Sequence, residues 1–140
     1  MDKLLYMRED LLEKLLKEFN WLEEIEAKTG ERTGEIIHLP VGEGWYELLR
    51  KMFCEIEQTM GRLNTDIRLI HPMVIEEKYG FLNVHIKTSL NGLQEIIDKY
   101  ESISESVCER CGSEQGSLKD IGWNFVLCNS CELIKLGENK

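Results

Sequence analysis

Apolar side chains recur at steps of three and four residues along residues 2–28, which is the spacing of an amphipathic helix. The main stripe consists of Leu5, Leu12, Leu15, Phe19, Leu22 and Ile25. Gly30 follows as a stop signal. We therefore predict a long N-terminal helix with one buried face. The same stripe would also suit the seam of a homodimer, and the spacing leaves that alternative open.

A second run with a single apolar face covers residues 45–63. That face consists of Trp45, Leu48, Leu49, Met52, Phe53, Ile56, Met60 and Leu63. The preceding residues 30–44 are rich in glycine and predict a loop with a short strand at residues 35–39. Cys54 lies beside the helical face, and we expect it to be a half-buried bystander thiol.

The periodicity changes to two over residues 67–87, which is typical of strands. Residues 67–71 and 81–86 are the predicted strands, and Val74 and Ile75 are an optional extension of the first strand beyond Pro72. Residues 76–80 connect the strands in a β-hairpin. His71 and His85 would then be neighbours, although strand histidines more often face solvent than bind a ligand. A third helix is expected from about Leu90 to Ser102, with Ser89 as its cap.

Four of the five cysteines form two C-x-x-C pairs, Cys108 with Cys111 and Cys128 with Cys131, separated by 16 residues. This spacing is typical of a four-cysteine zinc site, because two tight knuckles joined by a hairpin complete a tetrahedron. Four thiolates leave no open position on the ion, so a structural role is expected rather than a catalytic one. Iron is the alternative metal for such a ligand set.

These patterns together predict an α+β protein of three helices and a β-hairpin with a C-terminal zinc ribbon. The expected α+β domain covers residues 1–104, with an N-terminal helix at 2–29 and a core at 41–104. The expected four-cysteine zinc ribbon covers residues 105–140.

The charge balance bears on the class of partner. The chain has 17 Lys and Arg against 26 Asp and Glu, a formal net charge of -9. Phosphate backbones repel such a surface, so a protein partner is favoured over nucleic acid. No apolar run approaches the roughly 20 residues that span a bilayer, and the charged N-terminus is unlike a secretory signal. We expect a soluble protein of the bacterial host cytoplasm with no membrane contact.

Three stretches together resemble a family of small uncharacterised proteins associated with phages and prophages. Residues 42–49, beginning Gly42-Glu43-Gly44-Trp45, are similar to its GDGW helix start. Residues 76–82 resemble its KEKFGGLRFY hairpin, and residues 104–131 resemble its four-cysteine ending. Glu76 departs from the family's lysine, and the basic-aromatic run of the hairpin is replaced at residues 83–85. The resemblance implies a genomic context and no assigned activity.

No phosphate-binding loop, nucleophile elbow or zinc-protease motif occurs, so we expect no enzyme activity. The leading hypothesis is a non-enzymatic zinc-binding accessory protein of phage or prophage type. It would bind and modulate a bacterial host protein, such as a defence or transcription complex. The alternative is a zinc-ribbon regulatory protein that binds nucleic acid through a local basic patch. An enzyme would need a pocket that joins His71, His85 and an acid.

Overall fold

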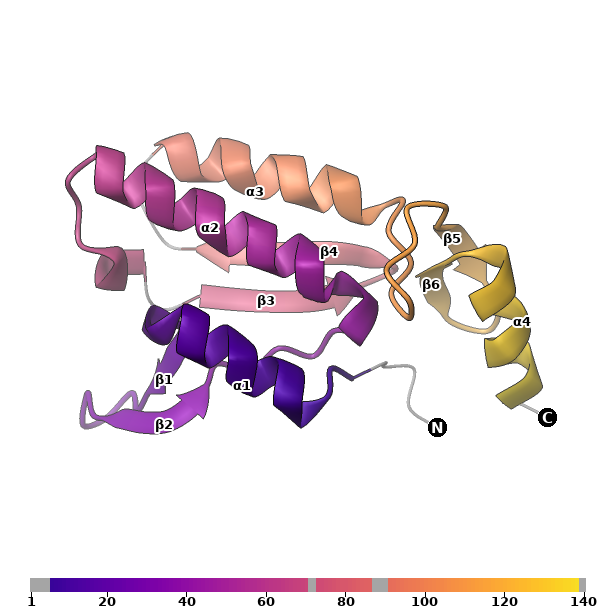
Figure 1. Ribbon diagram of the computed structural model, residues 1–140, viewed down its shortest axis with the longest axis horizontal. Coiled ribbons are helices and arrows are strands. Elements are labelled where there is room, and N and C mark those ends of the chain that lie inside the picture. The colour runs from indigo at the N-terminus through magenta and orange to yellow at the C-terminus, as the bar shows by residue number, and fades with distance from the viewer. Residues whose placement is uncertain (1–5, 71–72, 87–90, 139–140) are drawn as a thin grey trace.

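The computed structural model describes residues 6–70, 73–86 and 91–138 of the chain (Figure 1). Helices α2 (Tyr46–Arg62) and α3 (Asn91–Ser104) lie side by side over one face of a hairpin formed by β3 (Met73–Lys78) and β4 (Phe81–Ile86). This unit of two helices and two strands is the centre of the molecule, and the remaining segments pack around it.

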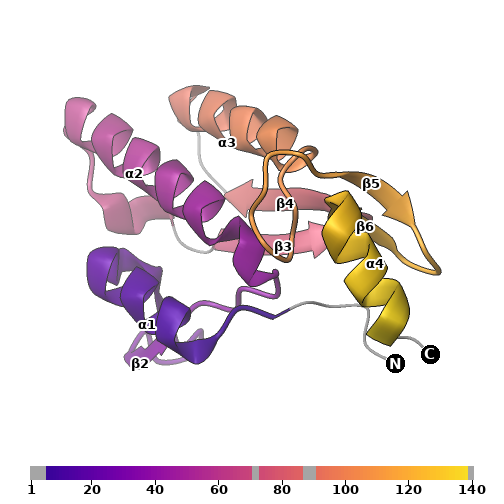
Figure 2. The same cartoon turned by 45° about the vertical axis from the view of Figure 1, so that its right-hand side comes forward.

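An N-terminal segment lies beside α2 on the side away from α3 (Figures 1 and 2). It contains α1 (Glu9–Glu18), the 3-10 turn η1 (Asn20–Leu22) and a hairpin of β1 (Glu23–Ile25) with β2 (Arg32–Ile36). The C-terminal segment lies at one end of the central unit. It contains the hairpin of β5 (Ser117–Asp120) with β6 (Asn124–Leu127), followed by α4 (Asn129–Glu138).

The predicted apolar face of α2 forms the middle of the core. Its members from Trp45 to Met60 are buried, and Leu63 alone of the predicted set is 49% exposed. Phe53 of α2 meets the rings of Phe19 and Trp21 at centroid distances of 5.4 and 5.6 Å, both edge to face. Such edge contacts add to the gain from burial, so this aromatic group fixes the N-terminal segment against α2.

The predicted N-terminal helix is too long, because α1 ends at Glu18. The chain then turns through η1 and enters β1, which pairs with β2. Trp21 explains the change, because its indole Nε1 donates a 2.8 Å hydrogen bond to Glu57 on α2 while its ring packs on Phe53. Tertiary packing of these side chains outweighs the helical spacing of apolar residues, which continues in the sequence beyond Glu18. The short strand expected at residues 35–39 overlaps β2 only at its end.

The β-hairpin is confirmed, but its first strand was predicted too early. Residues 67–70 form the 3-10 turn η3 (Ile67–Ile70) instead of a strand. The carboxylate of Asp66 accepts the backbone N–H of Arg68 at 2.9 Å, which favours a turn at this point. Strand β3 begins at Met73 and includes Glu76 to Lys78, which were expected in the connection. The connection is the two-residue turn Tyr79-Gly80, with both φ values positive.

Within the described residues the structure has four α-helices, one more than predicted, and three two-stranded antiparallel hairpins. The mixed α and β character is confirmed. The third predicted helix is α3, which extends two residues further and ends at Ser104. The unexpected helix is α4, and the unexpected hairpin is β1–β2. No helix in the described part of the chain is both long enough and apolar enough to cross a bilayer.

Candidate metal centre

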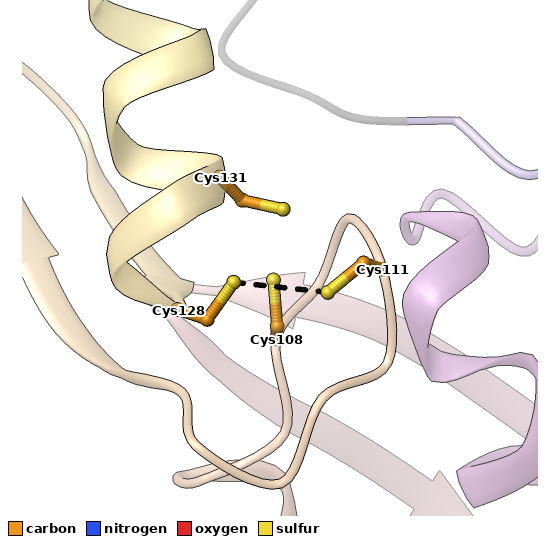
Figure 3. A group of neighbouring side chains, drawn as sticks. All are labelled: Cys108, Cys111, Cys128 and Cys131. Carbon is orange, nitrogen blue, oxygen red and sulfur yellow. Dashed lines mark hydrogen bonds between the residues drawn. The ribbon is translucent and has the colours of Figure 1, made fainter.

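The two C-x-x-C pairs meet at the end of the molecule between the first cysteine loop and α4 (Figure 3). All four sulfur atoms, of Cys108, Cys111, Cys128 and Cys131, lie within 4.8 Å of one another. The Sγ atoms of Cys111 and Cys128 are 3.7 Å apart. A metal with sulfur bonds of about 2.3 Å in a tetrahedron would separate its ligands by about 3.8 Å. The cluster therefore has the dimensions to hold one metal ion.

The first pair lies on a tight backbone loop. The backbone N–H of Gly112 donates to the carbonyl oxygen of Cys108 at 2.9 Å, and Cys108 N–H donates to Ser113 at 2.8 Å. Gly112 has a φ of 84°, a left-handed conformation that glycine adopts without steric cost. The loop thus directs the sulfurs of Cys108 and Cys111 to the same side, as a metal knuckle requires.

The second pair lies at the start of α4. Cys128 immediately precedes the helix, and Cys131 is in its first turn. The backbone N–H of Cys131 donates a hydrogen bond to the Cys128 sulfur and lowers the pKa of that thiol to about 7. Burial raises the pKa of the Cys131 thiol, and its contact with Cys128 adds to the increase. Cys128 is therefore the thiol of this pair that ionises more readily.

Exposure differs among the four sulfur ligands. Cys108 and Cys131 are buried, Cys128 is half-buried and Cys111 is exposed. The Ser113 N–H lowers the pKa of the Cys111 thiol, but burial and the adjacent Cys108 thiol outweigh it, so the pKa is raised. The cluster is thus most accessible to small molecules at Cys111 and is covered at Cys108 and Cys131.

A small apolar cluster supports the ligands. It consists of Cys108, Phe125, Leu127 and Cys131, and Ile121 and Cys128 pack on it. This cluster is separate from the main core, which ends at Val107. So few apolar side chains offset only part of the conformational entropy lost in ordering some 30 residues. A crosslink through a bound metal would stabilise the segment further.

Glu109 ties the first loop to β6, and sequence reasoning did not identify it. Its side chain is only 2% exposed. One carboxylate oxygen accepts the Val126 backbone N–H at 2.6 Å, and the Glu109 N–H donates to the Val126 carbonyl at 2.8 Å. Its burial could not be predicted from the sequence, because an acidic residue between two cysteines is normally expected to face solvent.

An ion pair joins the first loop to the far end of α4. The guanidinium of Arg110 lies 2.7 Å from the carboxylate of Glu138. This hydrogen bond from Arg110 holds the pKa of the Glu138 carboxyl below its usual range. The pair is partly exposed, so its contribution to stability is modest, but it orients α4 across the loop.

Two hydrogen bonds to backbone carbonyls attach the cysteine segment to the start of α2. Gly44 N–H donates to the carbonyl of Glu109 at 2.9 Å, and the Trp45 indole donates to the carbonyl of Val107 at 2.8 Å. A Cβ at Gly44 would lie 2.2 Å from the Cys108 carbonyl oxygen, so only glycine permits this approach. The glycine-tryptophan sequence before α2 therefore positions the candidate metal centre.

The other candidate residues lie outside this centre. Cys54 is half-buried on α2, and burial raises the pKa of its thiol, as expected for a bystander. His38 and His85 are both exposed; His38 lies in the loop after β2, and His85 lies on strand β4. His71 lies outside the described residues, so the expected pairing with His85 stays a prediction.

In comparisons with known proteins, no protein-family model, no curated protein and no solved structure matches the chain. The likeness to phage and prophage proteins accordingly stays a prediction. What the site can do follows from its own chemistry. Four sulfur donors around one ion leave no position for water or substrate, so the arrangement suits a structural metal.

Proposed function

We propose that Cys108, Cys111, Cys128 and Cys131 bind one structural zinc ion, and that the segment is a zinc ribbon extended by α4. The convergence of the four sulfurs within 4.8 Å is the observation that carries this proposal. Zinc suits the site because it favours four thiolates in a tetrahedron and has no redox chemistry in a reducing compartment. The ion would replace the apolar core that this segment lacks.

The function supported best is that of a non-enzymatic accessory protein that binds and modulates another protein. A metal ion with four thiolate ligands has no free coordination position for water or substrate, so it does not support catalysis. The net charge of -9 favours a partner with basic surface over a phosphate backbone. In keeping with the phage-type resemblance, we propose a bacterial host protein as the target, for example a defence or transcription complex in the cytoplasm.

Metal analysis tests the first part of the proposal. The purified chain, measured by native mass spectrometry and elemental analysis, is expected to carry one zinc ion per molecule. Cys131→Ser should lose that ion, whereas Cys54→Ser should keep it, because Cys54 is remote from the cluster. Stoichiometric iron with a visible thiolate-to-iron absorption band would replace zinc as the assigned metal. Absence of any bound metal from the wild-type protein would refute the site.

Affinity capture tests the second part. The tagged protein is incubated with nuclease-treated bacterial lysate, and retained proteins are identified by mass spectrometry. We expect one stoichiometric protein, retained by wild type and Cys54→Ser and reduced for the metal-free Cys131→Ser variant. Retention that disappears with nuclease would instead support the nucleic-acid-binding alternative. Equal retention by a denatured bait would mean that the capture is unspecific.

A further inference from the structure

The turn between β3 and β4 carries an exposed aromatic side chain between two hollows of the surface. Tyr79 lines both hollows, which have volumes of about 480 and 540 Å³. The first lies between this turn and α3, and the second lies between the turn and the β5–β6 hairpin. Tyr79 is 67% exposed, so most of its side chain is accessible to a partner.

Two further aromatic side chains complete this surface. Trp123, 48% exposed at the β5–β6 turn, lines the second hollow. Phe81, 37% exposed at the start of β4, lines the first. Rigid aromatic side chains left in solvent beside a hollow are typical of protein interaction sites. We name this surface, defined by Tyr79, Phe81 and Trp123, the aromatic surface.

The turn rests against the C-terminal segment, so that Tyr79 of the turn and Trp123 of that segment line the same hollow. A Cβ on Gly80 would lie 2.5 Å from Leu118 and 3.6 Å from Asn124, so the turn backbone contacts the β5–β6 hairpin directly. The second hollow therefore depends on the folded cysteine segment. The first hollow is built from β3, β4 and α3 and does not.

The hollows are lined with acids. Asp98 and Glu101 of α3 and Glu105, which directly follows that helix, border the first. Glu77 and Asp120 border the second. Lys78 is the one basic residue that lines either hollow among the described residues. Asp98, Glu105 and Asp120 form no ion pair within the part of the chain that the structure describes. Their charge is therefore available to an outside cation.

The chain itself shows that the Tyr79 ring accepts a cation. The ammonium group of Lys78 lies 5.9 Å from the centroid of that ring, at the outer limit of a cation–π contact. An arginine would satisfy both features of the surface, because its planar guanidinium stacks on aromatic rings and pairs with carboxylates in a fork. A lysine can approach the ring and the carboxylates as a point charge, but it offers neither planar stacking nor a fork of donors.

We propose that the aromatic surface binds an arginine-containing basic segment of the partner protein. This inference rests on the proposed function and specifies its partner by chemistry. One guanidinium stacks on Tyr79 beside the carboxylates of α3, or on Trp123 beside Asp120 at the end of β5, and those carboxylates neutralise its charge. Aromatic stacking gives preference for arginine over lysine, and the acids give the attraction at longer range.

Fluorescence anisotropy with a labelled oligo-arginine peptide tests the proposal on the intact zinc-loaded protein. We expect saturable binding at physiological ionic strength, stronger than for an oligo-lysine peptide of equal length. Tyr79→Ala and Trp123→Ala should each weaken binding about three- to tenfold, which is the effect of a partly desolvated cation–π contact. Tyr6→Ala, which removes a ring that is 57% exposed elsewhere, should leave it unchanged.

The acids are tested with charge-matched pairs. The double variant Asp98→Asn with Glu105→Gln should weaken binding, whereas Glu13→Gln with Glu24→Gln, which removes the same charge from exposed residues elsewhere, should not. Equal losses in both pairs would mean that the peptide senses only net charge, and would overturn the proposal. So would equal affinity for oligo-lysine. Unchanged circular dichroism and melting temperature for each variant exclude unfolding as the cause of a loss.

A final comparison separates this inference from the proposed function. If the wild-type protein captures a host protein, that capture is repeated with the double variant Tyr79→Ala and Trp123→Ala. Loss of the host protein would support the aromatic surface as its docking site. Undiminished capture would leave the accessory function in place and overturn the inference, because the partner would then bind elsewhere.

Discussion

The indole Nε1 of Trp45 donates a 2.8 Å hydrogen bond to the carbonyl oxygen of Val107, the residue before the first metal-ligand candidate. Trp45 is fully buried, and Val107 is the last member of the main core. The bond spans 62 residues of sequence. It connects the beginning of α2 to the beginning of the cysteine segment, so the packing of the central unit determines where Cys108 lies.

We predict that Trp45→Phe lowers the free energy of unfolding by about 1–3 kcal/mol, because the buried Val107 carbonyl loses its donor. For a chain of this size that corresponds to a melting temperature lower by about 3–10 °C. Differential scanning calorimetry of the zinc-loaded protein measures it. Trp123→Phe is the matched control, since that indole is 48% exposed. An unchanged melting temperature for Trp45→Phe would show that the bond contributes nothing.

Gly44→Ala is predicted to destabilise the protein and to lower its affinity for the proposed metal ion. The added methyl group would lie 2.2 Å from the Cys108 carbonyl oxygen, so the first cysteine loop must move. Overpacking of this kind costs about 1–3 kcal/mol. Gly61→Ala on α2 meets no atom within 4 Å and should raise stability slightly through helix propensity. Chelator competition and thermal melts of both variants check the contrast; a similar response in the two would contradict it.

Removal of the proposed metal ion is predicted to unfold the cysteine segment and leave the central unit folded. The two apolar clusters are separate, and only the smaller one contains metal-ligand candidates. Addition of a chelator, or acidification that protonates the thiolates, should abolish dispersed amide resonances of β5, β6 and α4. Resonances of α2 and α3 should persist. Heteronuclear NMR spectra with and without chelator measure this, and a concerted loss of all resonances would contradict it.

The sequence predicted the elements whose periodicity matches their burial. The apolar face of α2 and the strand β4 were located correctly, because each has one face on the core and a turn signal at its end. The cysteine spacing likewise predicted which four side chains meet. In these cases local pattern and tertiary structure agree, so the sequence alone suffices.

The elements that were missed lack that agreement. In α4 the apolar residues Leu133, Ile134 and Leu136 are exposed, whereas Cys131 belongs to the small cluster. The helix therefore has no buried apolar stripe from which it could have been predicted. The end of α1 was missed because Phe19 and Trp21 are held by contacts with Phe53, which is distant in sequence. Long-range contacts of this kind leave no periodic signal.

Alkaline pH is predicted to destabilise the protein through Tyr100. Burial, aided by a hydrogen bond with Glu55, raises the pKa of its phenol from 10.0 to about 12. The folded state therefore favours the neutral phenol, and this stabilisation is complete below pH 10 and is lost as pH rises toward about 12. Between pH 10 and about 12, the free energy of unfolding should fall less for Tyr100→Phe than for wild type. Urea unfolding at a series of pH values measures this difference. Tyr79→Phe, which removes an exposed phenol, should behave like wild type.

Substitution of Glu109 is predicted to separate its role as a hydrogen-bond acceptor from its charge. The carboxylate accepts the buried Val126 N–H at 2.6 Å. Glu109→Ala leaves that donor without this acceptor and should cost about 1–3 kcal/mol, together with a measurable loss of zinc affinity. Glu109→Gln retains an acceptor oxygen and should cost less. Chemical denaturation and competition with a zinc-binding dye measure the two effects.

Exposed Glu114, in the same segment, is the control for Glu109, and Glu114→Ala should change neither stability nor zinc affinity appreciably. If Glu109→Gln instead proved as damaging as Glu109→Ala, the negative charge itself would be required. That result would mean that the Val126 N–H requires a charged acceptor rather than a neutral amide oxygen. If neither substitution had an effect, the link between the first loop and β6 would be carried by the paired backbone contact of Glu109 N–H with the Val126 carbonyl alone.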